Sequence, residues 1–218
     1  MTLVPGVADD QLGQYYRRTT AIADRLGKSL PFDTVMEALQ RIYEGQFGEA
    51  LQAVASSARK ITRRLFGDSE VVISAVDGAQ ALARAKQVFT GYIDADFVNW
   101  GLDEAGEATP VQKVQVEEMT KNGTFRQIFG GFGVDFNRLC LTQHQVKQFC
   151  IEHQDKLRTE GYGTFFLFKN KTGDKFFVAV VLFDDDGRLE VYVRQLGSGH
   201  VWDAEFRHRF VVPQLDAQ

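Results

Sequence analysis

The last quarter of the chain contains the run that most constrains its fold. Residues 176–183 (FFVAVVLF) are apolar at every position, which is typical of a strand buried on both faces of a sheet. Two similar runs flank it, TFFLFK at 164–169 and LEVYVR at 189–194. The turn before the second run contains Asp186-Gly187, and this pair favours a tight hairpin because glycine adopts positive φ without a Cβ clash. The sequence therefore predicts three adjacent antiparallel strands, with 176–183 as the central strand.

A fourth strand is expected after the turn Gly197-Ser198-Gly199, because apolar and polar residues alternate from Val201 onward. If this segment is extended, one face carries Trp202, Ala204, Phe206, His208, Phe210 and Val212. The opposite face carries Asp203, Glu205, Arg207 and Arg209. The prediction for residues 163–214 is thus a four-stranded antiparallel β-meander.

The rest of the chain predicts helices. Apolar side chains recur at helical spacing in three early segments, 9–26, 35–43 and 47–66. Later helices are expected at 78–94, after Pro110 and after the capping-box residue Thr142.

The expected fold class is therefore α+β. An N-terminal helical region of about three helices occupies 1–67, and an α+β domain occupies 68–218. In that domain, helices pack on one face of the antiparallel meander.

Composition argues against several classes of function. The net charge of −4 provides no overall basic field for nucleic acid or an anionic membrane. No apolar run approaches the roughly 20 residues that span a bilayer, and the start of the chain lacks the features of a signal peptide. Cys140 and Cys150 are too few for a disulfide scaffold and are expected to be reduced. We therefore expect a cytoplasmic protein with no cofactor and a core rich in its 18 phenylalanines.

Two acids in the middle of the chain are candidate metal ligands. Asp94 and Asp96 lie two positions apart, so in an extended segment both carboxylates point the same way and can share a divalent cation. The alternative is a helix end with an aromatic plug and solvated acids. The sequence contains no EF-hand spacing and no zinc motif.

The predicted last strand supplies the candidate binding residues Trp202, Asp203, Glu205, Arg207, His208 and Arg209. His208 interrupts an apolar face, and a buried imidazole needs a polar partner. Its face is therefore exposed, or a carboxylate or carbonyl lies opposite. The favoured interpretation of the charged face is a solvated ion network, and the alternative is a polar binding surface.

Arg59, Lys60, Arg63 and Arg64 cluster at the end of the predicted helix 47–66. Cations at this position interact favourably with the negative C-terminal end of the helix dipole. The alternative is that this cluster is a local patch for phosphate or nucleic acid, and the overall charge makes a nucleic-acid partner the weaker expectation.

Three stretches resemble small uncharacterised bacterial proteins that belong to no named family: LPFDTVMEALQRIYEGQF (30–47), FTGYIDADFVNWG (89–101) and HVWDAEFRHRFVVPQL (200–215). The resemblance implies a bacterial origin. It implies no known activity, so it transfers no site residue.

We expect a non-enzymatic binding protein whose partner is another protein. The first alternative is a metal-dependent hydrolase that uses Asp94 and Asp96, with Asp203 or Glu205 as a further ligand. The second is nucleic-acid contact through the basic end of helix 47–66.

Overall fold

The computed structural model describes residues 40–41, 43–45, 61–66 and 70–215. The chain divides into two units, Met1–Ala58 and Arg59–Gln218. Gln40, Arg41 and Tyr43 are helical. The remainder of the helices predicted before residue 61 lies outside the described residues.

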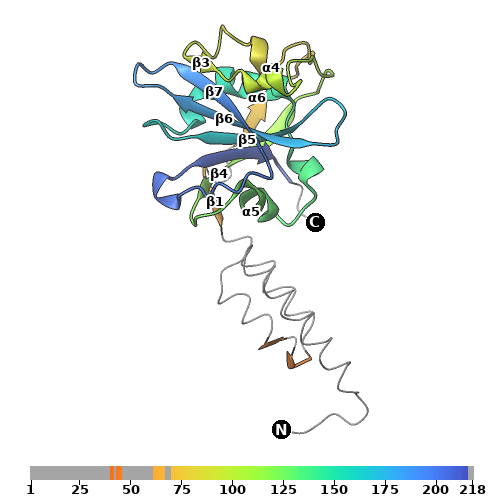
Figure 1. The fold of residues 1–218 in the computed structure, drawn as a ribbon, viewed down its shortest axis with the longest axis vertical. Helices are drawn as coiled ribbons and strands as arrows, with labels where there is room; N and C mark the ends of the chain where they lie inside the picture. Colours follow the sequence, from red (N-terminus) through yellow and green to blue (C-terminus); the bar gives the residue numbers. More distant parts are fainter. Residues whose placement is uncertain (1–39, 42, 46–60, 67–69, 216–218) are drawn as a thin grey trace. The chain divides into compact units, whose positions relative to one another are not determined.

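Eight strands of the second unit form one mixed sheet. They are β1 (Thr62–Arg64), β2 (Val71–Ile73), β3 (Tyr92–Ile93), β4 (Gln112–Met119), β5 (Thr164–Lys169), β6 (Phe176–Phe183), β7 (Leu189–Gln195) and β8 (Arg209–Pro213). Their order is β1-β4-β8-β5-β6-β7-β3, and β2 also pairs with β4. Figure 1 shows this series from β3 through β7, β6, β5 and β4 to β1. The pairs β5–β8 and β3–β7 are parallel, and the other pairs are antiparallel.

The prediction of a four-stranded antiparallel meander is wrong. Strands β5, β6 and β7 do pair antiparallel in sequence order. The last strand, however, crosses back to lie between β5 and β4, parallel to the former and antiparallel to the latter. Alternation in a sequence shows that a segment is half buried but does not show which strand it joins, and this explains the error.

Two segments predicted to be helical are strands. β1 occupies the end of the predicted helix 47–66, and β4 lies where a helix was expected after Pro110. The buried β4 residues Val114 and Val116 are two positions apart, as strand geometry requires. The predicted helix 78–94 is also absent: the segment contains one short 3₁₀ turn, η1 (Leu82–Arg84), and then β3.

Three α-helices occur in residues 70–215. These are α4 (Asp96–Asn99), α5 (Phe125–Gly130) and α6 (Gln143–Glu152). The predicted capping box at the start of α6 is confirmed, because Thr142 and Gln145 exchange side-chain to backbone hydrogen bonds. Three further 3₁₀ turns are η2 (Phe136–Leu139), η3 (Gln154–Lys156) and η4 (Ala204–Phe206). None of the described helices combines the length and apolar character that crossing a bilayer requires.

Hydrophobic clusters lie on both faces of the sheet. Successive residues of β5 alternate between them, with Phe166 and Phe168 in one and Phe165 and Leu167 in the other. Residues of α6 and η1 join the first cluster, and residues of α5 and η2 join the second. The expectation that helices cover one face is therefore wrong. Strand β6 is buried on both faces as expected, but β5 occupies the middle of the strand order.

Candidate functional site

The segment before β8 does not have the extended geometry predicted for it. Trp202 forms an isolated antiparallel bridge with Gly123, after which η4 (Ala204–Phe206) turns the chain. Asp203 accepts a hydrogen bond from the Glu205 amide, and Arg207 has a left-handed φ of 50°. The four charged residues therefore do not share one strand face. Only Arg209 begins a strand, and its guanidinium donates to the backbone oxygens of Lys156 and Leu157.

His208 is the centre of an aromatic cluster. Its side chain is buried, with ring centroids 5.0 Å from both Phe165 and Trp202. Its Nδ1 accepts a hydrogen bond from the backbone N–H of Gly163 at 3.2 Å. The expected polar partner thus exists, but it is a donor and not the carboxylate or carbonyl anticipated. Burial lowers the pKa of His208 to about 4, so the imidazole is neutral at physiological pH.

Asp94 and Asp96 lie where β3 ends and α4 begins, and both contact protein donors. Asp94 Oδ2 lies 3.0 Å from Nη1 of Arg194 and accepts from the Val193 amide, while its Oδ1 accepts from the Asp96 amide. Asp96 accepts from the Asn99 side chain. β3 pairs with β7 only as far as Val191, and beyond that point the Asp94 carboxylate accepts hydrogen bonds from the edge of β7. Among the described residues, no group of three or more His, Cys, Asp or Glu lies together to hold a metal ion.

The two described residues of the basic cluster face acids on β4. Arg63 forms a 2.6 Å ion pair with Glu118, and Arg64 is in register with Glu117. Burial raises the pKa of Glu117, while the nearby Thr62 hydroxyl and Arg64 oppose that rise. Arg59 and Lys60 lie outside the described residues.

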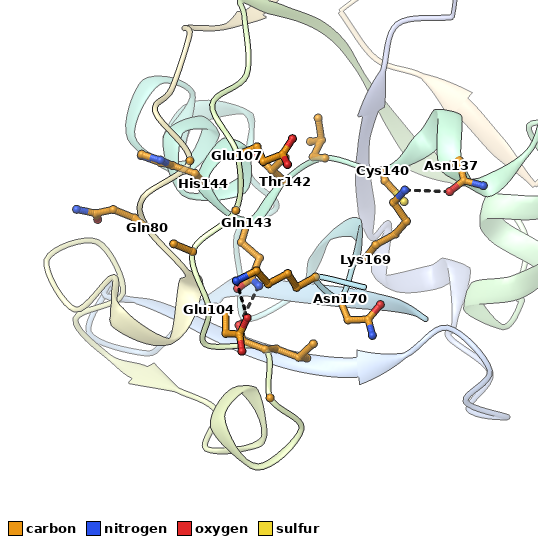
Figure 2. Close-up of a pocket in the computed structure, with 17 residues that line it drawn as sticks. Gln80, Glu104, Glu107, Asn137, Cys140, Thr142, Gln143, His144, Lys169 and Asn170 are labelled. Atoms are coloured by element: carbon orange, nitrogen blue, oxygen red, sulfur yellow. Dashed lines mark hydrogen bonds and ion pairs between the residues drawn. The ribbon is translucent and has the colours of Figure 1, made fainter. Parts of the chain in front are cut away.

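A polar groove of about 740 Å³ brings together segments that are far apart in the sequence. It is lined by Gly78 and Gln80, by residues 101–102 and 104–107, by Asn137 and residues 140–144, and by residues 169–171. We use "polar groove" for this set of residues (Figure 2).

Backbone contacts hold the groove loop in place. The Gly106 amide donates to the Gly78 carbonyl at 3.0 Å, and Val76 and Thr109 form an isolated bridge beside them. Gly78 has a φ of +77°, and a Cβ there would lie 2.2 Å from the Glu107 backbone. Only glycine therefore permits this close approach.

The start of α6 is fastened to the same loop. The side chain of Gln143 donates to the Leu102 carbonyl at 2.8 Å and accepts from the Leu82 amide at 3.0 Å. Hydrogen bonds therefore connect the loop 101–107 to both Gly78 and the start of α6.

Charges of both signs line the polar groove. Lys171 and Glu104 form a 2.9 Å ion pair between the β5–β6 turn and the loop. The ammonium of Lys169 donates to the neutral Asn137 oxygen at 3.0 Å. Glu107 is exposed at the other side of the lining. Lys169 and Glu107 form no ion pair with any residue that the structure describes.

The groove residues that carry familiar catalytic groups are not arranged as a nucleophile and base. Cys140 donates to the Phe136 carbonyl, and burial raises its pKa to about 12. His144 Nδ1 lies 3.1 Å from Asp77 Oδ1, and burial lowers its pKa, helped by Lys147 and opposed by Asp77. Figure 2 shows the His144 ring directed away from Cys140 and Lys169.

Sequence reasoning did not identify the groove residues as a site. Two signals for its walls were visible: the loop signals between Gly101 and Pro110, and the capping box at Thr142. Lys169 and Glu107, however, are separated by 62 positions (169 − 107), and no spacing rule joins them. They line one groove because the tertiary structure brings residues 104–107 and the end of β5 to the same hollow.

The chain matches no protein-family model, no curated protein and no solved structure.

Proposed function

We propose that this chain is a non-enzymatic cytoplasmic binding protein, and that the polar groove receives a charged segment of a partner protein. The observation that carries the proposal is the pair Lys169 and Glu107. These charges have opposite signs, line the same groove and form no ion pair with a described residue. A partner segment with one acidic and one basic side chain complements both, and such complementarity favours one partner over others.

The chemistry of the groove supports binding over catalysis. A thiol with a pKa of about 12 is a poor nucleophile, because only the thiolate attacks. The volume of about 740 Å³ falls within the range of ligand-binding clefts. The braced loop also supports binding, because a rigid site loses little conformational entropy when it is filled.

The two cysteines support the cytoplasmic part of the proposal. Cys140 and Cys150 are both free, and Cys150 is buried. Free thiols are typical of proteins in a reducing compartment.

The test is a peptide-array screen with the full-length protein. We expect it to select short peptides that combine an acid with a base. The variants Lys169→Gln and Glu107→Gln should each weaken binding of a selected peptide about tenfold, as expected for loss of one charge-assisted contact. Lys86→Gln and Asp185→Asn are matched controls, because both residues are exposed and lie outside the groove.

Two results would overturn the proposal. One is selection of no peptide that carries both charges. The other is equal weakening by the groove variants and by the controls, because that would place binding elsewhere on the surface.

A further inference from the structure

A second hollow borders the β5–β6 turn. Its volume is about 480 Å³, and it shares only Asn170 with the polar groove. We call it the aromatic hollow because Trp100, Phe176 and Phe177 line it. Neither the predicted site residues nor the proposed function involves these side chains.

Trp100 presents an exposed flat ring on a rigid base. Trp100 is 37% exposed. Its ring centroid lies 5.9 Å from that of the buried Phe177. Its backbone N–H donates to the Asp96 carbonyl and so caps α4. An indole held in this way offers a face for stacking, and aromatic stacking of a base contributes about 1–3 kcal/mol.

Two cations line the same hollow. Arg126, near the start of α5, and Lys175, in the β5–β6 turn, are both exposed. Within the described part of the chain, neither forms an ion pair.

The one carboxylate in the lining, that of Asp174, accepts hydrogen bonds from within its own turn. Asp174 accepts hydrogen bonds from the Thr172 hydroxyl and the Asn170 amide, and these bonds lower its pKa. The Asn170 side chain is also used within the turn, because its oxygen accepts from the Lys175 amide. The two cations outnumber the one carboxylate in the lining, so the hollow keeps a net positive charge that favours an anionic ligand.

We propose that the aromatic hollow binds a small ligand that has a planar ring and an anionic group, as a nucleoside monophosphate does. The ring stacks on Trp100, and the phosphate contacts Arg126 and Lys175. Guanidinium and ammonium groups bind phosphate through charge-assisted hydrogen bonds. The proposal is independent of the polar groove and of its partner.

Tryptophan fluorescence provides a direct readout. The chain has 2 Trp, and Trp202 forms no hydrogen bond through its buried Nε1 to any described residue. Trp202→Phe therefore removes no such bond and leaves Trp100 as the reporter. In this background AMP, GMP, CMP and UMP should be titrated, with adenosine and inorganic phosphate as partial ligands.

We expect saturable quenching by at least one nucleotide. Adenosine should bind more than about tenfold more weakly, because it lacks the phosphate and therefore both cation contacts. Inorganic phosphate alone should not quench the fluorescence. Calorimetry on the wild-type chain checks that the Trp202→Phe background has not changed the affinity.

Variants assign the binding to residues. Arg126→Gln and Lys175→Gln should each weaken nucleotide affinity about fivefold to tenfold while leaving adenosine affinity unchanged. Trp100→Leu should abolish binding of both ligands, as measured by calorimetry because this variant lacks the fluorescent reporter, and Lys86→Gln is the matched control. Circular dichroism melts establish that each variant is folded.

The proposal is overturned if no nucleotide gives a saturable signal at ligand concentrations up to about 5 mM. A dissociation constant above that limit corresponds to a barely specific contact. It is also overturned if the quenching persists in Arg126→Gln and Lys175→Gln with unchanged affinity. A signal that is equally strong with adenosine would contradict the role of the two cations.

Discussion

The backbone N–H of Gly163 donates to Nδ1 of His208 over 3.2 Å, and the Arg209 N–H donates back to the Gly163 carbonyl. Gly163 comes immediately before β5 and His208 immediately before β8. The two bonds therefore join the starts of two parallel strands at the centre of the sheet. Because Nδ1 is the acceptor, the proton of the neutral ring resides on Nε2.

This geometry predicts a loss of stability in acid. The pKa of His208 is about 4 in the folded protein, against 6.5 for an unperturbed histidine. Its contribution is therefore fully present above pH 6.5 and is lost as the pH falls from 6.5 towards 4. Across that interval the free energy of unfolding falls by about 3 kcal/mol.

The measurement is chemical denaturation across this pH range for wild type and His208→Gln. The variant should be less stable at neutral pH and should lose less stability in acid, because it has no proton to gain. His200→Gln is the matched control, since His200 is exposed. An identical pH dependence in wild type and His208→Gln would show that His208 is not the titrating group.

Gly163→Ala is expected to destabilise the fold. A Cβ at this position would lie 2.7 Å from Cε1 of Phe165 and 3.1 Å from Cγ1 of Val180. Both neighbours are buried, so relief requires movement of the core, and overpacking of this kind typically costs about 1–3 kcal/mol. Gly199→Ala is the control, because no atom lies within 4 Å of its Cβ position. Equal melting temperatures for the two variants would contradict the prediction.

Asp94→Ala is expected to loosen the edge of the sheet. The change removes the acceptor of Arg194, of the Val193 amide and of the Asp96 amide. Loss of a part-buried ionic acceptor of this kind costs about 1–3 kcal/mol. Thermal melts should show the loss, whereas Asp185→Ala at the exposed hairpin tip should change little. If a divalent cation stabilises the wild type but not Asp94→Ala, the carboxylate is a metal ligand and this account is wrong.

Cys140 is expected to resist alkylation in the folded protein. Burial raises the pKa of its thiol to about 12, so at pH 8 only about 1 in 10,000 molecules carries the thiolate. Iodoacetamide should therefore modify Cys140 far more slowly in buffer than in denaturant, as read by mass spectrometry of the proteolytic peptide that contains Cys140. Rapid modification without denaturant would require an exposed thiolate and would contradict this placement.

Local sequence patterns predicted several elements correctly. The apolar runs and the Asp186-Gly187 turn correspond to β6, β7 and the hairpin between them. Thr142 and Gln145 form the predicted capping box. In each case the interacting residues are close in the chain, so the pattern contains the information that the structure uses.

Patterns failed where a distant segment decides the conformation. Residues 201–208 alternate as a strand does, yet the Trp202–Gly123 bridge and η4 give them another path. Val114 and Val116 had too weak a pattern to identify β4, which is stabilised by pairing with β1, β2 and β8 on its two sides. Strand preference depends strongly on such neighbours.

The sequence by itself determined the hairpin strands, the helix cap at Thr142 and the phenylalanine-rich core, because short-range spacing and burial encode them. Tertiary structure alone decided that β8 lies between β4 and β5, that His208 accepts from Gly163, and that Lys169 and Glu107 line one groove. These relationships join residues between 45 and 62 positions apart, or strands from separate regions of the chain. Their geometry depends on the packing of the whole sheet, which no local pattern contains.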